Sequence, residues 1–328
     1  MAKGAYIGVN NVARKIKKCY IGVDGIARKI KKAYIGIGGI ARPCWSGELA
    51  YYGTVDSVSA KKRNLVATSV GDYALFGGGA PITDCSVNAY SKSLTRSLPT
   101  ELSVGRYNLA ATTVGDYALV GGGYGSSFTS TVDAYNKSLT RSTPTELSEA
   151  RETLAATSVG DYALFGGGRS AASGNSTRCS TVDAYNKSLT RSTPTELSVG
   201  RASLSATSVG DYALFGGGRN SSKRFDTVDA YNKSLTRSTP TVLSVARHYL
   251  AATSFGDYSL FGGGESSSSG GVCSTVDAYD KSLTRTTPTE LSVARYRLAA
   301  TSIGDYALFG GGAGASTANY SEVDAYVV

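Results

Sequence analysis

The sequence predicts an all-β protein: a six-bladed β-propeller of four-stranded blades, preceded by a small segment of β-hairpin repeats. Composition is the first observation, because 40 Gly and 22 Tyr among 328 residues, with only seven Pro, are typical of β-structure with many tight turns. The second is a motif, Gly-Asp-Tyr-(Ala/Ser)-Leu-(Phe/Val)-Gly-Gly-Gly, that occurs six times at spacings of 44 to 50 residues. The third is a shorter motif that recurs every 14 residues near the N-terminus.

Residues 1–46, which we call the stem, are predicted to form three consecutive β-hairpins. Tyr-Ile-Gly begins at Tyr6, Tyr20 and Tyr34, and the turn candidates that follow are Asn10-Asn11, Asp24-Gly25 and Gly38-Gly39. Residues 1–45 hold ten basic residues and one acidic residue, a balance of +9, whereas the rest of the chain holds 24 of each. So small a sheet buries little surface alone, which predicts association with itself or with an acidic partner.

Each long repeat reads as four short antiparallel strands. In the third copy these strands are expected over residues 154–159, 162–165, 181–185 and 189–194, separated by a Gly-Asp turn, a loop after the triple Gly and an Asn-Lys-Ser turn. Spacings of 44 to 50 residues fit one four-stranded propeller blade per copy. The propeller is therefore assigned to residues 47–328.

The two ends of the propeller are expected to complete one blade. The last copy reaches Val328 with three strands, while residues 50–58, ahead of the first copy, have the character of a strand. We predict that residues 50–58 form the outer strand of the last blade, because this pairing would remove two exposed strand edges.

Variation among the six copies shows where function is expected. From the Val of Val-x-Ala-Tyr to the next Gly-Asp the separation is 28 residues in all five comparisons, so every length change lies in the loop after the triple Gly. A second variable spot is the residue pair after a repeated Arg. In an antiparallel blade both positions emerge on one face, and Tyr, Arg, Asn, Ser and Gly on loops over a fixed scaffold are typical of antibody-like binding surfaces.

We therefore predict a ligand-binding face, which we call the variable face. Its candidate residues are Arg63, Asn64, Tyr107, Asn108, Tyr124, Phe128, Glu152, Arg169, Arg178, Arg219, Arg224, Phe225, His248, Tyr249, Glu265, Tyr296, Arg297, Asn319 and Tyr320. Relaxed drift in solvent-exposed loops is the plain alternative, but the two-residue spot varies strongly without any freedom of length.

Residues fixed in every copy are assigned to the scaffold. These are the repeated arginines Arg106, Arg151, Arg201, Arg247 and Arg295, with Lys62 in register, and the aspartates Asp133, Asp183, Asp229, Asp277 and Asp324. Because the Arg is fixed across the blades, a structural role is favoured over a ligand-binding ring. We expect each Arg to form hydrogen bonds with carbonyls or carboxylates of the neighbouring blade.

Catalytic chemistry is not indicated. The chain has one His, His248, without an identifiable nucleophile or partner acid, so a contact role is expected for it. Five cysteines without Cys-x-x-Cys spacing read as free thiols, and the triple Gly lacks the Lys-Ser/Thr of a phosphate loop. We expect no catalytic residue, no metal site and no cofactor.

The long repeat resembles the kelch repeat. The resemblance is carried by Arg-x-x-Leu, Gly-Asp-Tyr-Ala-Leu-Phe-Gly-Gly and Val-Asp-Ala-Tyr-Asn along residues 62–326, although the kelch Trp after the third-strand Tyr is missing here. The stem motif Tyr-Ile-Gly-Val, followed by Ala-Arg-Lys-Ile-Lys-Lys, resembles segments of bacteriophage and prophage tail-associated proteins, and the long repeat is similar to kelch-like proteins of that kind.

These resemblances imply a virion-attached receptor-binding protein. The variable face would meet a host cell-surface glycan or protein, and the stem would join an acidic virion partner or other copies of itself. No signal peptide and no apolar membrane-spanning stretch are seen, so we expect synthesis in the cytoplasm, no membrane insertion and assembly into the virion. The alternatives are an intracellular kelch-type protein-interaction adaptor, a propeller glycosidase or lyase using Glu152 and Glu265, and nucleic-acid binding by the stem, the last being disfavoured.

Overall fold

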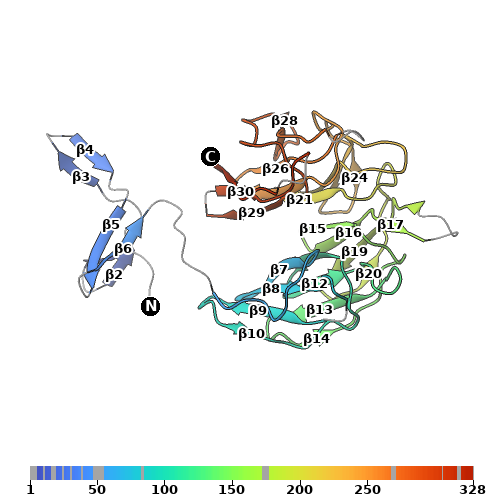
Figure 1. Ribbon diagram of the computed structural model, residues 1–328, viewed down its shortest axis with the longest axis horizontal. Coiled ribbons are helices and arrows are strands. Elements are labelled where there is room, and N and C mark those ends of the chain that lie inside the picture. Colours follow the sequence, from blue (N-terminus) through green and yellow to red (C-terminus); the bar gives the residue numbers. More distant parts are fainter. Residues whose placement is uncertain are drawn as a thin grey trace. The chain divides into compact units, whose positions relative to one another are not determined.

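The computed structural model divides the chain into two compact units, residues 1–55 and 56–328. It describes residues 6–9, 12–15, 20–23, 26–29, 32–37, 40–46, 55–82, 85–171, 177–266, 271–304, 306–315 and 319–327. Every element found in these residues is a β-strand, which confirms the all-β class (Figure 1).

The smaller unit contains the three predicted hairpins (Figure 1). They are β1 (Tyr6–Val9) with β2 (Val12–Lys15), β3 (Tyr20–Val23) with β4 (Ile26–Lys29), and β5 (Lys32–Ile37) with β6 (Ile40–Ser46). Opposed residues at the hairpin ends are Val9 with Val12, Val23 with Ile26 and Ile37 with Ile40. This register is that of two-residue connections, whose predicted turn pairs lie outside the described residues.

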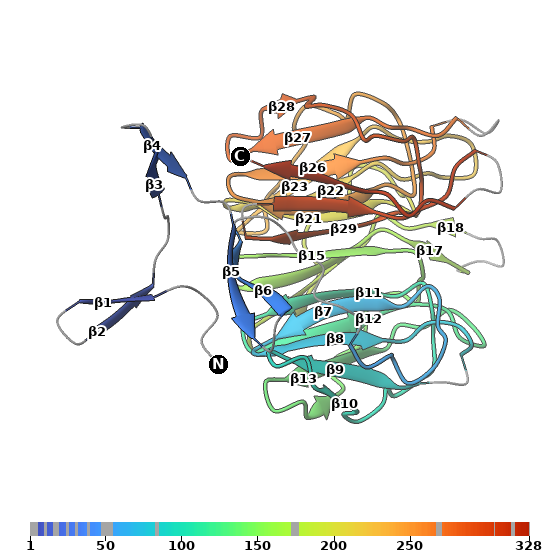
Figure 2. The same cartoon turned by 60° about the vertical axis from the view of Figure 1, so that its left-hand side comes forward.

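The larger unit is built from six consecutive antiparallel sheets, the predicted blades, which follow one another in sequence order (Figure 2). Blade one has β7 (Val66–Val70), β8 (Tyr73–Gly77), β9 (Val87–Ser91) and β10 (Arg96–Ser97); blade two has β11 (Ala110–Val114), β12 (Tyr117–Gly121), β13 (Val132–Asn136) and β14 (Arg141–Ser142). Blade three has β15 (Ala155–Val159), β16 (Tyr162–Gly166), β19 (Val182–Asn186) and β20 (Arg191–Ser192); blade four has β21 (Ser205–Val209), β22 (Tyr212–Gly216), β23 (Val228–Asn232) and β24 (Arg237–Ser238). Blade five has β25 (Ala251–Phe255), β26 (Tyr258–Gly262), β27 (Val276–Asp280) and β28 (Arg285–Thr286), and blade six has β29 (Ala299–Ile303), β30 (Tyr306–Gly310) and β31 (Val323–Val327). An additional pair, β17 (Arg169–Ser170) and β18 (Thr177–Arg178), stands in the loop of blade three.

Neighbouring blades from two to six share one repeated apolar contact. The Phe at the end of the second strand packs over the last Gly of the same strand in the preceding blade, so that a Cβ on Gly121 would lie 2.9 Å from the Phe165 ring. Phe165 also meets Tyr185 of its own blade edge-on at 5.9 Å, and both rings are fully buried. Burying one such ring stabilises the fold by about 2–3 kcal/mol, and the contact recurs from blade to blade.

The repeated Arg and Asp form an ion pair in each blade from two to six, and both side chains are fully buried in blades two to five. The Arg151 guanidinium donates to the Asp183 carboxylate at 2.6 Å and to the carbonyl of Phe165 at 3.1 Å. Asp183 also accepts from Arg191 and from the backbone N–H of Ser148. Both side chains are completely buried, so the ring of arginines belongs to the scaffold and is not a ligand surface. The bonding partners lie in the blade that each Arg leads into, which corrects the prediction of partners in the neighbouring blade.

Blade one departs from this pattern at both positions together. Lys62 stands where the other blades have Arg, and Asn88 stands where they have Asp. The Lys62 ammonium donates to the carbonyl of Ser86 at 2.9 Å, and the Asn88 amide oxygen accepts from Arg96 and from the Ser59 backbone. Neutral Asn88 thus removes the charge that a buried Arg would need.

Only part of the predicted closing strand, residues 50–58, belongs to the described residues. Residues 50–54 lie outside the described residues, and residues 55–58 do not form a strand, which corrects the predicted end at Val58. Instead, the Asp56 carbonyl accepts from the Tyr90 hydroxyl at 2.7 Å, as the Thr100 carbonyl accepts from Tyr135 in blade two. Residues 56–62 therefore follow the path of the connection that leads into every later blade.

Blade six has three strands among the described residues, and its free side is exposed. Ile303 on β29 and Val323 on β31 are 56% and 60% exposed, whereas Val209 and Val228 at the same places in blade four are buried. A Cβ on Gly304 would meet none of the described residues within 4 Å, while one on Gly160 would touch Lys233 of the next blade. Closure against blade one stays a prediction.

Candidate functional site

Six residues on the variable face, one from each blade, are linked in series by backbone hydrogen bonds. They are Asn64, Asn108, Thr153, Ser203, Tyr249 and Arg297, the second members of the variable pairs, and all have φ between 52° and 56°. The N–H of each of the last five donates to the carbonyl of the residue before it in this series, at 2.9 to 3.3 Å. This left-handed conformation is unfavourable for side chains other than Gly or Asn, so the bonds between blades must hold it.

The first members of the pairs bring the two variable sets together. Each pairs as an isolated antiparallel bridge with the residue that follows the triple Gly of its own blade: Arg63 with Ala80, Tyr107 with Tyr124, Glu152 with Arg169, Ala202 with Arg219, His248 with Glu265, and Tyr296 with Ala313. The loops and the pairs therefore meet on one face, as the sequence predicts.

Two groups of aromatic residues stand on this face. Around blades five and six, the Arg297 guanidinium lies 4.5 Å from the Tyr249 ring centre and 5.7 Å from that of Tyr296. On blade two, Tyr124 stacks between Tyr107 at 5.8 Å and Phe128 at 5.2 Å. These rings are partly exposed, and flat aromatic surfaces beside guanidinium groups are the usual anchors of binding sites.

Tyr249 lies in a region of positive electrostatic potential. Burial alone would raise the pKa of Tyr249, but hydrogen bonds with Arg297 and Ser203 and the charges of Arg297 and Arg219 lower it below its ordinary value. The Arg219 guanidinium lies 5.7 Å from the centre of the same ring.

Two hollows on this face are lined in part by Tyr249. The wider has a volume of about 470 Å³ and is lined by residues of five blades, namely Asn64, Leu65, Asn108, Leu109, Thr153, Tyr249, Arg297 and Leu298. The smaller, about 110 Å³, is lined by Asn108, Glu152, Thr153, Arg169, Arg178, Ala202, Ser203, Arg219 and Tyr249. Because Asn108, Thr153 and Tyr249 belong to both linings, the two hollows adjoin.

Several predicted site residues serve the structure beneath this face. Glu152 is 1% exposed, where it ion-pairs with Arg169 and accepts from the Asn108 amide at 2.9 Å. Phe225 is buried, and its backbone bonds to Gly218 and Arg247. Phe225 is thus a core residue and not a ligand contact, a correction that follows from its position at the inner end of its loop.

His248 is also buried, which corrects its expected role as a surface contact. Its Nδ1 lies 3.0 Å from the carbonyl oxygen of Glu265, and its ring packs against Tyr249 at 4.5 Å. Burial is the main cause that lowers the pKa of His248, aided by Arg219 and Arg224, so the ring is neutral at neutral pH. His248 supports Tyr249 from below.

Four further predicted residues belong to the loops after the triple Gly: Arg224, Glu265, Asn319 and Tyr320. Arg224 donates to Glu265 at 3.1 Å, and both side chains are about one-fifth exposed. Asn319 is exposed and bridges to Ala313, while the Tyr320 N–H donates to the carbonyl of Gly312 at 2.9 Å. Arg63 and Asn64 are exposed on blade one.

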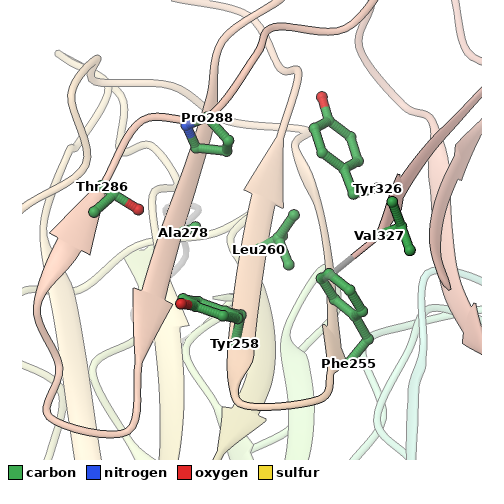
Figure 3. Close-up of a pocket in the computed structure, with 8 residues that line it drawn as sticks. All are labelled: Phe255, Tyr258, Leu260, Ala278, Thr286, Pro288, Tyr326 and Val327. Carbon is green, nitrogen blue, oxygen red and sulfur yellow. The ribbon is translucent and has the colours of Figure 1, made fainter. Parts of the chain in front are cut away.

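A further cavity, of about 300 Å³, lies away from the variable face between blades five and six. Its lining is mostly apolar and comprises Phe255, Tyr258, Leu260, Ala278, Thr286, Pro288, Tyr326 and Val327 (Figure 3). Between blades three and four, a leucine from the turn before the fourth strand, Leu235, packs together with Tyr162 against the core cluster at this place. The described part of blade six supplies no such leucine. The repeat pattern of the sequence does not predict this cavity, because its lining residues stand mostly at repeat positions that also pack between the earlier blades.

Metal-ligating groups do not gather in the part of the chain that the structure describes: no cluster of three or more His, Cys, Asp or Glu side chains occurs there. None of the described residues belongs to a helix that could span a lipid bilayer. No protein-family model matches the chain, and no curated protein matches it.

Proposed function

We propose that this protein is a non-enzymatic binding protein whose variable face recognises a glycan or protein on the surface of a host cell. One observation carries the proposal: length and chemistry vary among the six copies at positions that meet on one face, over a scaffold of repeated buried contacts. A surface that served only folding would need no such diversity on one face.

Binding is favoured over glycoside hydrolysis by the state of the two carboxylates at the face. Glu152 is ion-paired with Arg169, and Glu265 with Arg224. A glycosidase needs one carboxyl group to protonate the leaving oxygen and a second to act as nucleophile or base, so both groups must be free to reach the substrate. Here each carboxylate is held by a guanidinium group of the protein itself.

The setting we propose is a bacteriophage virion, with the protein attached through its stem. The resemblance of the stem motif to tail-associated segments and of the long repeat to kelch-like proteins supports this setting. A screen of the fluorescently labelled full chain against bacterial strains and a glycan panel tests it. We expect labelling of a restricted set of strains that survives protease treatment of the cells if the receptor is a glycan; failure to label any cell or glycan would contradict the proposal.

The stem is proposed to associate with itself and to dock on an acidic virion protein. Nine net positive charges on residues 1–45 oppose self-association, but salt screens them over about 8 Å at 0.15 M while apolar contact persists. Higher salt should therefore strengthen oligomers of the full chain, as measured by light scattering. Monomers at every salt concentration, identical to a chain of residues 47–328, would refute self-association.

A further inference from the structure

Blades three and four place arginines at equivalent positions on the variable face. Arg169 on β17 is opposed by Arg178 on β18, and in the next blade Arg219 is opposed by Arg224. The corresponding pairs are Tyr124 with Phe128 in blade two and Glu265 with Val272 in blade five. Like charges directly opposed across two strands destabilise the pair, so this double arrangement needs a compensating partner.

Two of these guanidinium groups are paired with carboxylates of the described residues. Glu152 pairs with Arg169, and Glu265 pairs with Arg224 at 3.1 Å. Arg219 forms no ion pair with any described residue, and its guanidinium stands over the Tyr249 ring. Burial, followed by repulsion from Arg169 and Arg219, lowers the pKa of Arg178, in accord with the crowding of positive charge.

These groups converge on the smaller hollow of the face. Three of the four arginines line it, together with one carboxylate and the polar side chains of Asn108, Thr153 and Ser203. Its volume of about 110 Å³ is the space of roughly three to four water molecules at about 30 Å³ each, which suits one compact oxyanion group. Guanidinium forks bind carboxylate and phosphate oxygens in pairs, with both geometry and charge matched.

We propose that this arginine pocket binds the oxyanion group of an acidic cell-surface glycan, either the carboxylate of an acidic sugar or a phosphodiester. The inference rests on the proposed function and names the class of ligand. Tyr249, Asn108 and Thr153 line both hollows, so an anionic group in the small hollow leaves its sugar in the wider one, against the Tyr249 ring. Arg297 stands on the same ring and extends the positive surface.

The test compares two single substitutions in the full chain by thermal unfolding. Arg219→Met removes a pocket charge without breaking an ion pair, and Lys187→Met removes the same charge on another face, where Lys187 pairs with Asp161 and is more than half exposed. Probes are inorganic phosphate, glucuronate and, as a neutral control, glucose, each at constant ionic strength set with chloride.

We expect phosphate or glucuronate to raise the melting temperature of the wild-type chain and of Lys187→Met by at least about 2 °C, since a ligand that binds only the folded state stabilises it. The larger of the two shifts tells a phosphodiester from a carboxylate as the natural group. Arg219→Met should lose at least half of the shift. Equal shifts in the two variants, or none with either anion in the wild type, would overturn the pocket.

Labelling of cells separates this inference from the function on which it rests. If the wild-type chain labels cells and Arg219→Met labels them as strongly as Lys187→Met, the pocket is refuted while the binding function stands. If the wild-type chain labels no cell although the anion shift is present, the binding function fails and the anion site remains.

Discussion

Tyr249 illustrates what a single residue does on this face. Its φ of 53° is unfavourable for an aromatic side chain, yet its N–H donates to Ser203 and its carbonyl accepts from Arg297. Strain of this kind costs about 1–3 kcal/mol per residue and persists only where the surroundings fix it. Comparison of the six copies identifies this position because its residue varies. The comparison does not predict the positive φ, since none of the six residues is a glycine.

A buried neutral His248 makes stability depend on pH in a defined direction. Its pKa is lowered from the ordinary 6.5, chiefly by burial, so the unfolded chain binds a proton more readily as pH falls below about 7. The stability that His248 contributes is therefore present at neutral pH and is lost on acidification. We predict that His248→Gln flattens the fall in melting temperature between pH 8 and 5; curves that run parallel for the two proteins would show that His248 is not the cause.

The sequence predicts least well which side chains of the variable face are buried and which are exposed. Glu152, His248 and Phe225 occur in the variable set but are buried, whereas Tyr107 and Tyr296, at the same place in the repeat as Glu152 and His248, are partly exposed. Tyr124, Phe128 and Arg297, from the same set, remain on the surface. Variation among the copies locates the surface element, whereas the contacts of each individual side chain decide whether it reaches solvent.

At the scale of the elements, repetition made the blades predictable. Strands two and three match the expected ranges within about one residue, because Tyr-Ala-Leu-Phe and Val-Asp-Ala-Tyr alternate between two packed sheet faces. The fourth strand is only two residues long, Arg191–Ser192, since pairing stops where the chain turns towards the next blade. The sequence does not predict the β17–β18 pair, because it depends on the conformation of the loop after the triple Gly, which is longest in this copy.

The buried ion pair of each blade should behave differently from the surface pair of the same blade. Asp183→Asn leaves Arg151 charged and buried without its counter-ion, and we expect a loss of about 3–5 kcal/mol in the free energy of unfolding. Asp161→Asn breaks the exposed pair with Lys187 and should cost less than about 1 kcal/mol. Urea unfolding of both variants checks this; equal losses would contradict the scaffold role.

At the scale of the whole molecule, closure of the propeller ring is predicted by the sequence but is not tested by the described residues. Residues 47–54 precede the segment at Asp56 that enters blade one, and the free side of blade six exposes Ile303, Val323 and Val327. We predict that deleting residues 1–54 destabilises the propeller relative to deleting residues 1–46. Burial of two such side chains stabilises the fold by about 3 kcal/mol. Loss of the strand that covers them should therefore lower the melting temperature by roughly 5 °C in a domain of this size.

Equal melting temperatures for these two truncations would show that residues 47–54 do not close the ring. Both truncations keep Asp56, Ser59 and Lys62, whose contacts with blade one are part of the described structure, so the comparison isolates the predicted strand.

The central claim is that one face of the propeller binds the host, and a comparison of two faces tests it most directly. Tyr249→Ala combined with Arg297→Ala removes an aromatic anchor and its guanidinium partner, whereas Lys137→Ala combined with Lys187→Ala removes exposed charges from the turns of the scaffold. Anchors of this kind cost about 2 kcal/mol or more on truncation, a loss of at least roughly 30-fold in affinity. For a strain that the wild-type chain labels, we predict such a loss for the first variant and unchanged binding for the second; the reverse result, with both variants folded, would contradict the account.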